Sequence, residues 1–165
     1  MKKFLALFFA LFMTLSLAAC GGDPEIPADV NWEECLITET VNGMLTVTGV
    51  TDLGKAQQVI VIPATVGGAP LKAIGQAAFS GCQQLKNLYI NADCSISYLN
   101  NGAFEGAISL SKIFVGKKHS EITVSSGLMD GASSAAKFYV PSAYYADYTT
   151  DYQWGAFSSK IQRQE

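Results

Sequence analysis

Three consecutive residues have the side-chain types of a hydrolase triad: His119, Ser120 and Glu121. A triad works only when its groups converge, so that the imidazole takes the serine proton while the acid orients the imidazole. Neighbours in an extended segment point to opposite sides of the backbone, so these side chains cannot meet one another. We interpret the run as a coincidence.

Cys94 and His119 form a second candidate pair, because an imidazole can activate a thiolate nucleophile. They are 25 positions apart, which predicts neighbouring coils of the repeat described below, about 5 Å apart. No glycine-rich oxyanion turn or orienting acid accompanies them, and both are expected in a loop outside the repeat core. We therefore do not expect catalysis there.

The remaining chemistry-bearing residues suggest no site. Glu33 and Glu34 are adjacent and the other acids are scattered, so no carboxylate pair for glycoside hydrolysis is indicated. The chain has one histidine, no Cys-x-x-Cys spacing and no phosphate-binding glycine loop. The sequence predicts no enzyme, no catalytic residue, no cofactor and no metal site.

Composition indicates a folded, acidic protein. Of 165 residues, 49% are hydrophobic and 15% charged, unlike disordered chains. Eleven Lys and Arg against 14 Asp and Glu give a net charge of -3. Nucleic acid is therefore not an expected partner.

The first residues have the order of a secretory signal. Lys2 and Lys3 precede the apolar run Phe4 to Met13, which is shorter than the roughly 20 residues that span a bilayer. Leu17-Ala18-Ala19-Cys20 follows and resembles the lipobox of bacterial lipoproteins. The resemblance implies lipidation of Cys20 after cleavage before it. An ordinary cleaved signal with a cysteine at that place is the alternative.

This reading predicts a lipoprotein signal peptide at 1–19 and a lipid-anchored tether at 20–29, extended and solvated because it is rich in glycine, proline and acids. The membrane is then a partner through the N-terminal lipid. The expected location is the bacterial cell envelope after export, either within it or exposed at the surface.

A 25-residue period dominates the rest of the chain. Ala78-Phe79-Ser80-Gly81-Cys82 recurs as Ala103-Phe104-Glu105-Gly106-Ala107 and, degraded, as Leu128-Met129-Asp130-Gly131-Ala132. Each copy continues into a strand-like alternation of apolar residues: Leu85, Leu88, Ile90; Leu110, Ile113, Val115; Ala135, Phe138, Val140. So short a repeat cannot bury its own apolar face, so the copies must stack into a solenoid.

Ile62-Pro63, Ile74-Gly75 and the first copy from Ala78 to Ile90 resemble the BspA-like leucine-rich repeat family, over roughly Asn42 to Ile161. Members are bacterial envelope or secreted proteins, many implicated in adhesion, and the resemblance implies no catalytic residues. This chain departs from the family pattern in its short length and in Met129 and Ala135, where larger residues are usual.

The predicted fold is an α/β leucine-rich-repeat solenoid, a short right-handed coil of about three to four repeats with a strand ladder. A β-hairpin cap is expected at 30–58, where Asn42-Gly43 separates two strands, and the repeats at 59–141. A helical cap is expected at 142–165. There Ser142 would cap a helix from Ala143 to Tyr152, followed by a second helix with an apolar stripe of Trp154, Phe157 and Ile161.

Two further groups favour structural roles. Cys35, Cys82 and Cys94 are an odd number, so at least one thiol is unpaired or bonded to another chain, and Cys82 is expected to be a buried core thiol. Four tyrosines near the C-terminus are interpreted as part of the cap rather than a ligand platform: Tyr144, Tyr145, Tyr148 and Tyr152.

The strand register predicts one candidate binding surface. Tyr89, Phe114 and Tyr139 share one outward position, 25 residues apart, and would stack as a ladder across strands about 4.8 Å apart. Two positions earlier lie Asn87, Lys112 and Lys137, also expected to point outward. Such a strip can hold a glycan or an extended peptide, or it can simply stabilise the sheet.

Two function classes follow. The favoured one is a non-enzymatic, lipid-anchored envelope module for recognition or adhesion, whose repeat face binds a protein or glycan. The alternative is an envelope structural or assembly protein with no host-directed ligand.

Overall fold

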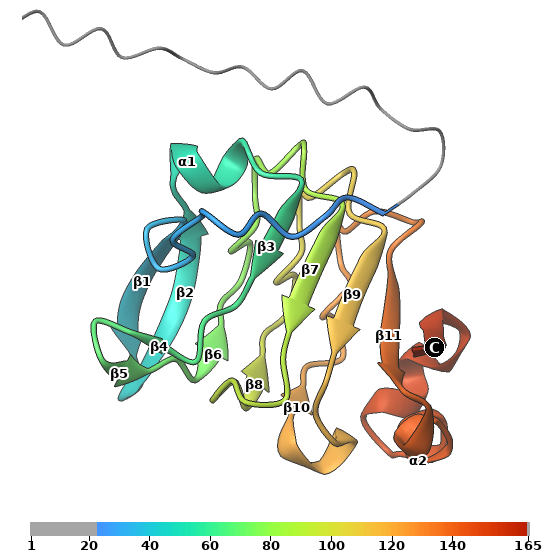
Figure 1. Ribbon diagram of the computed structural model, residues 1–165. Helices are drawn as coiled ribbons and strands as arrows, with labels where there is room; N and C mark the ends of the chain where they lie inside the picture. Colours follow the sequence, from blue (N-terminus) through green and yellow to red (C-terminus); the bar gives the residue numbers. More distant parts are fainter. Residues whose placement is uncertain (1–22, 165) are drawn as a thin grey trace, which may run out of the picture.

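The computed structural model describes residues 23–164. The expected signal peptide and Cys20 lie outside these residues. Within residues 23–164 the chain winds as a coil whose successive turns add strands to two separate five-stranded sheets (Figure 1).

The first sheet contains the strands predicted from the repeat. All its neighbours pair in parallel, and in the three middle strands the register places residues that are 25 apart side by side, such as Leu88, Ile113 and Phe138. The predicted register is therefore confirmed. The strands, in spatial order, are β3 (Val59–Val61), β7 (Asn87–Ile90), β9 (Lys112–Val115), β11 (Lys137–Pro141) and β12 (Ile161–Gln164).

The second sheet starts with the expected hairpin. Asn42 and Gly43, at φ 52° and 77°, form the two-residue turn that joins its strands. The other strand pairs are parallel and two residues long, too short for an alternating pattern to reveal them. The order is β1 (Leu36–Val41), β2 (Met44–Val50), β6 (Ala73–Ile74), β8 (Tyr98–Leu99) and β10 (Thr123–Val124).

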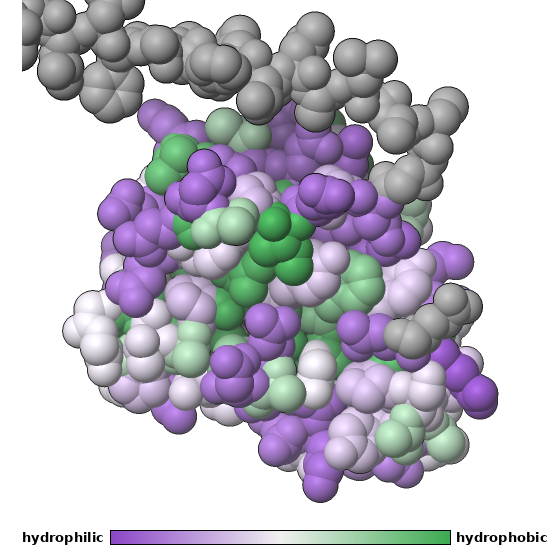
Figure 2. Space-filling model, viewed as in Figure 1, coloured by the Kyte–Doolittle hydropathy of each residue, from purple (hydrophilic) through white to green (hydrophobic). Residues whose placement is uncertain are grey.

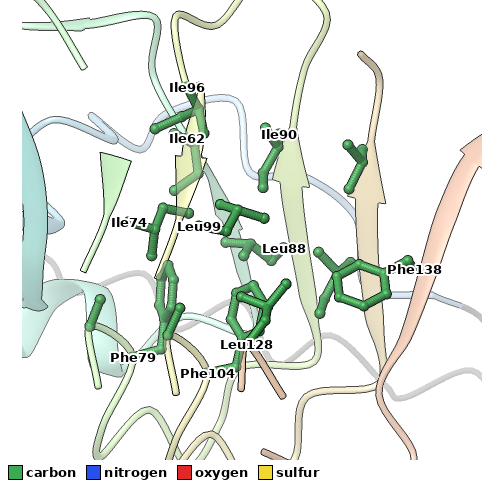
Figure 3. Close-up of a cluster of buried hydrophobic side chains, with 14 of the residues drawn as sticks. Ile62, Ile74, Phe79, Leu88, Ile90, Ile96, Leu99, Phe104, Leu128 and Phe138 are labelled. Atoms are coloured by element: carbon green, nitrogen blue, oxygen red, sulfur yellow. The ribbon is translucent and has the colours of Figure 1, made fainter. Parts of the chain in front are cut away.

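One apolar core fills the space between the sheets (Figure 3). A chain of aromatic contacts runs along it: ring centroids are 5.9 Å apart for Phe79 and Phe104, 6.4 Å for Phe104 and Phe138, and 5.3 Å for Phe138 and Trp154. Each coil thus packs on the next through a bulky ring, as a solenoid requires.

The third repeat departs from the predicted pattern in one position. Ala135 is exposed and Ala136 is buried, although the 25-residue spacing assigned the inward position to Ala135. Met129 is only partly buried where the earlier copies bury a phenylalanine, and Phe138 supplies the bulk instead by contacting Phe104.

The C-terminal segment corrects two predictions. The Ser142 hydroxyl donates to the Gln164 carbonyl and does not cap a helix. Ile161 lies on a strand and not on a helical stripe, because β12 pairs with β11 and satisfies backbone groups that an open sheet edge would expose. The helical elements here are a 3-10 turn (Ser142–Tyr144), α2 (Tyr145–Thr150) and a 3-10 segment (Trp154–Lys160).

Short elements complete the chain. Thr51 caps α1 (Asp52–Lys55) through a bond from the Gly54 amide. The remaining elements are a small hairpin of β4 (Thr65–Val66) and β5 (Ala69–Pro70) and a 3-10 turn (His119–Glu121). From residue 23 to residue 164, no helix combines the length and apolar character needed to cross a membrane.

Candidate recognition surface

Three aromatic side chains form a stacked row on the outer face of the first sheet. The rings of Tyr89 and Phe114 are nearly parallel, 8° apart, with centroids at 4.4 Å, and those of Phe114 and Tyr139 are 5.2 Å apart. All three are half-buried, while the residues directly before and after each of them along its strand are buried in the core. The predicted aromatic ladder is therefore present as a geometric feature.

The ladder borders a trough of about 590 Å³ that extends further than the sequence suggested. Gln162 of β12 lies in register with Tyr139 and continues the row by one position. Ile161-Gln162-Arg163-Gln164 contains one apolar residue and therefore no alternation that could reveal this strand, and the apolar stripe at Trp154 and Phe157 favours a helix. The lining residues are Asp23, Tyr89, Lys112, Phe114, Tyr139, Gln162, Arg163 and Gln164.

The row at the strand starts is covered at one end and open at the other. Val59, Asn87, Lys112 and Lys137 are in register across the four strands. Val59 and Asn87 are 2% and 1% exposed, the Lys112 side chain is 30% exposed, and Lys137 is exposed. Asn87 lies at the predicted outward position of its strand, but it is buried where the prediction expected an exposed side chain.

The segment 23–31, which we call the strap, lies across this row. It crosses the starts of β9, β7 and β3 on the outer face (Figure 1), and the Asp23 carboxylate accepts a 2.6 Å hydrogen bond from the Lys112 ammonium. Pro24, Pro27 and Val30 are half-buried. The predicted tether is thus extended from residue 23 onward, and it lies along the sheet with one side half-buried and the other exposed to solvent.

Lys112 connects the strap to the ladder. Its ammonium lies 5.4 Å from the centre of the Tyr139 ring, within the range of a cation–π contact. The hydrogen bond from Lys112 to Asp23 raises the pKa of Lys112. Figure 2 shows apolar side chains over β3 and β9 on this face, with polar side chains around them. The surface therefore combines apolar area with fixed charge.

The Cys94 and His119 pair has no nucleophilic character. Cys94 is 3% exposed and belongs to the core, so the expectation that it lies outside the core is wrong. Burial raises the pKa of its thiol, which keeps it protonated near neutral pH. His119 instead packs edge-to-face against Tyr148, with ring centroids 6.0 Å apart.

The other two cysteines described by the structure are also buried, free thiols, Cys35 and Cys82. Burial raises the pKa of Cys82 to about 11 and also raises that of Cys35. Within residues 23–164, no group of three or more His, Cys, Asp or Glu side chains is placed to hold a metal ion.

The C-terminal tyrosines do not form one platform. Tyr148 is fully buried, and its hydroxyl donates to the Lys117 carbonyl at 2.8 Å. Tyr144 and Tyr145 pack partly against the core, whereas Tyr152 is 93% exposed. The placement of Tyr144, Tyr145 and Tyr148 is that of side chains covering the end of the core.

A second hollow, of about 550 Å³, lies on the outer face of the other sheet. Its lining carries no charged side chain and includes Met44, Thr46, Tyr98, Asn100 and Ser125. Tyr98 is the exposed aromatic residue of this face, at 37%. It provides a matched control for the ladder.

The strand ladders and the stacked core define a short repeat solenoid. No family model and no curated protein matches the chain. Similar solved structures are bacterial leucine-rich repeat proteins. One, from Bacteroides ovatus, is 16% identical with a TM-score of 0.37 over 66% of this chain, and another, TpLRR from T. pallidum, is 17% identical with a TM-score of 0.40 over 73%. This chain spans 37% and 66% of their lengths, respectively.

Proposed function

We propose that this protein is a non-enzymatic recognition or adhesion module of the bacterial cell envelope, lipid-anchored through Cys20, with a repeat solenoid of the BspA-like leucine-rich type. The ladder face of the first sheet is its binding surface, and its ligand is an extended protein segment or a glycan. The observation that supports this most is the stacked row of Tyr89, Phe114 and Tyr139 beside an open trough.

The side chains around the trough fit this role. Aromatic faces supply apolar contact area with few rotamers to fix, and nearby ammonium and amide groups set the orientation of a ligand. Lys112 and Gln162 stand on either side of the ladder in this way. Catalysis is not proposed, because the described residues bring no nucleophile, base and oxyanion donor together.

The anchor and the surface would be close to each other. With Cys20 lipidated, three residue steps separate it from Asp23, a span of at most about 10 Å. While Asp23 pairs with Lys112, the ladder face is then held near the membrane.

The alternative is an envelope structural or assembly protein that uses the same face for a partner of its own cell. Capture of envelope and host components by the full chain tests the proposal. The parent is compared with a variant carrying Tyr89→Ala, Phe114→Ala and Tyr139→Ala, and with a Tyr98→Ala control. A ligand retained by the control and lost by the ladder variant, with both folded by circular dichroism, supports the ladder. Equal capture by all three contradicts it.

A further inference from the structure

Building on the proposed function, we infer that the ladder surface takes an extended acidic peptide, and that the strap occupies part of this site as a built-in competitor. The expected partner is a polypeptide segment with carboxylates, because the chain already places such a segment of its own on this surface.

The strap has the properties of a ligand bound across strands. It crosses the strand starts of β9, β7 and β3 (Figure 1), the row in which Val59 and Asn87 are 2% and 1% exposed. Its Asp23 carboxylate is held by Lys112, which also contacts the ladder ring of Tyr139. The occupied part of the face therefore selects for negative charge at β9.

The fit of the strap is incomplete at Asn87. This side chain is 1% exposed, and neither its amide nitrogen nor its carbonyl oxygen has a hydrogen-bond partner among the described atoms. A carboxamide can donate twice and accept through its oxygen, which matches the N–H and C=O groups of a peptide backbone. The strap contains two prolines, Pro24 and Pro27, which have no N–H to offer. A peptide with other residues at those places satisfies Asn87 better.

The strap is also held weakly enough to exchange. Residues 23–30 make no backbone hydrogen bond to another described residue. Their one ion pair, between Asp23 and Lys112, is 47% and 30% exposed on its two side chains, and such pairs contribute little to stability. Segments with few hydrogen bonds and little burial open readily.

Lys137 extends the charge preference beyond the strap. It lies next to Lys112 in register, it is exposed, and no described carboxylate is within ion-pair distance of it. The strap runs from Lys112 toward β3, away from Lys137. Adjacent strands are about 4.8 Å apart and an extended peptide rises about 3.3 Å per residue, so an acid one or two positions before the aspartate reaches Lys137.

Fluorescence anisotropy with two labelled peptides tests this inference on the full chain in mild detergent. One peptide copies residues 21–31, and the other has aspartate in place of its first glycine. The peptides are titrated with three proteins: the parent, Asp23→Lys and Asp29→Lys. Asp23→Lys places a positive charge opposite Lys112. Asp29→Lys makes the same charge change at an exposed strap residue whose carboxylate forms no ion pair with a described residue.

We expect the copied peptide to bind Asp23→Lys at least tenfold more tightly than it binds the parent, because the internal competitor is released. Asp29→Lys should behave like the parent. The second peptide should bind Asp23→Lys at least threefold more tightly than the first, and Lys137→Ala in that background should remove the gain. Equal affinity of parent and Asp23→Lys, or no binding at millimolar peptide, overturns the inference.

A neutral oligosaccharide, cellohexaose, separates this inference from the proposed function. If cellohexaose binds the parent and Phe114→Ala weakens it while neither peptide binds, the peptide inference is wrong and the ladder function stands. If the peptides bind Asp23→Lys and a folded Phe114→Ala variant in that background binds them equally well, the strap competes elsewhere and the ladder function is wrong.

Discussion

Val59 and Asn87 lie side by side on the outer face of the first sheet, and both are buried, at 2% and 1% exposure. Outward-facing side chains of a solenoid sheet are expected to be exposed to solvent. The burial of this pair therefore marks the part of the sheet along which the strap runs. The row at the strand starts is therefore buried at β3 and β7, partly exposed at β9 and exposed at β11.

Replacing Asn87 by leucine, which has a similar shape, should stabilise the fold. The buried carboxamide has no partner among the described atoms, and removing an unpaired buried polar group is favourable by about 1 kcal/mol. We expect Asn87→Leu to raise the free energy of unfolding by about that amount in urea titration. Lys137→Leu, at the same strand position in the exposed part of the row, is the control and should change little. A loss of stability in Asn87→Leu would mean that the amide is paired in solution.

Phe79 and Phe104 should be the most costly residues to truncate. Their rings stack at 5.9 Å inside the core, so alanine at either position leaves a cavity between two coils, which costs about 3 to 5 kcal/mol. Tyr152→Ala, at a side chain that is 93% exposed, is the matched aromatic control and should leave stability unchanged. Chemical unfolding of the three variants measures this. Small, equal losses would contradict the stacked core.

How well each part of the fold can be predicted depends on the number of residues that carry its sequence pattern. The four-residue alternation of Leu88 and Ile90 recurs every 25 residues, so strands β7, β9 and β11 and their aromatic row follow from the sequence, whereas β12 does not. The two-residue strands such as β6 and β8 carry no readable alternation. The burial of Asn87 is associated with a segment more than 50 residues earlier in the chain. The composition of that segment predicts only a solvated tether.

Asp151 should make stability depend on acidity. Burial acts to raise the pKa of this carboxyl, but it is outweighed by the amides of Trp154 and Gln153, which donate to it, so the pKa is lowered overall. A lowered pKa in the folded state means that the stabilisation is fully present above the unfolded value, near about 3.9, and is lost as pH falls through the folded value.

We therefore expect Asp151→Ala to cost about 1 kcal/mol at neutral pH, as for a lost cap, and the gap between parent and variant to close as pH falls through the lowered pKa of Asp151. Urea titrations across this pH range measure the gap. Asp93→Ala, at an exposed carboxylate, should show no such gap. If the difference in stability between parent and Asp151→Ala persists unchanged in acid, the stabilisation does not come from the ionised Asp151 carboxylate accepting these hydrogen bonds.

Cys20 should carry lipid in the mature protein. The motif that ends at Cys20 resembles a lipobox, so mass spectrometry of the mature N-terminus should find a diacylated or triacylated cysteine. Cys20→Ala should release the protein from the membrane fraction, since two or more acyl chains are needed for stable anchoring. An unmodified N-terminus at another residue would leave an ordinary cleaved signal as the correct reading.

Phe114 is the centre of the ladder, in contact with both Tyr89 and Tyr139, and its truncation tests the recognition surface most directly. The measurement is the affinity of the ligand captured by the full chain, determined for the parent, Phe114→Ala and Tyr98→Ala. We predict a loss of about 1 to 2 kcal/mol, or roughly 5- to 30-fold in Kd, for Phe114→Ala, because central aromatic residues dominate binding energy. Tyr98→Ala should bind as the parent does. Unchanged affinity in a folded Phe114→Ala variant would show that the ladder only stabilises the sheet.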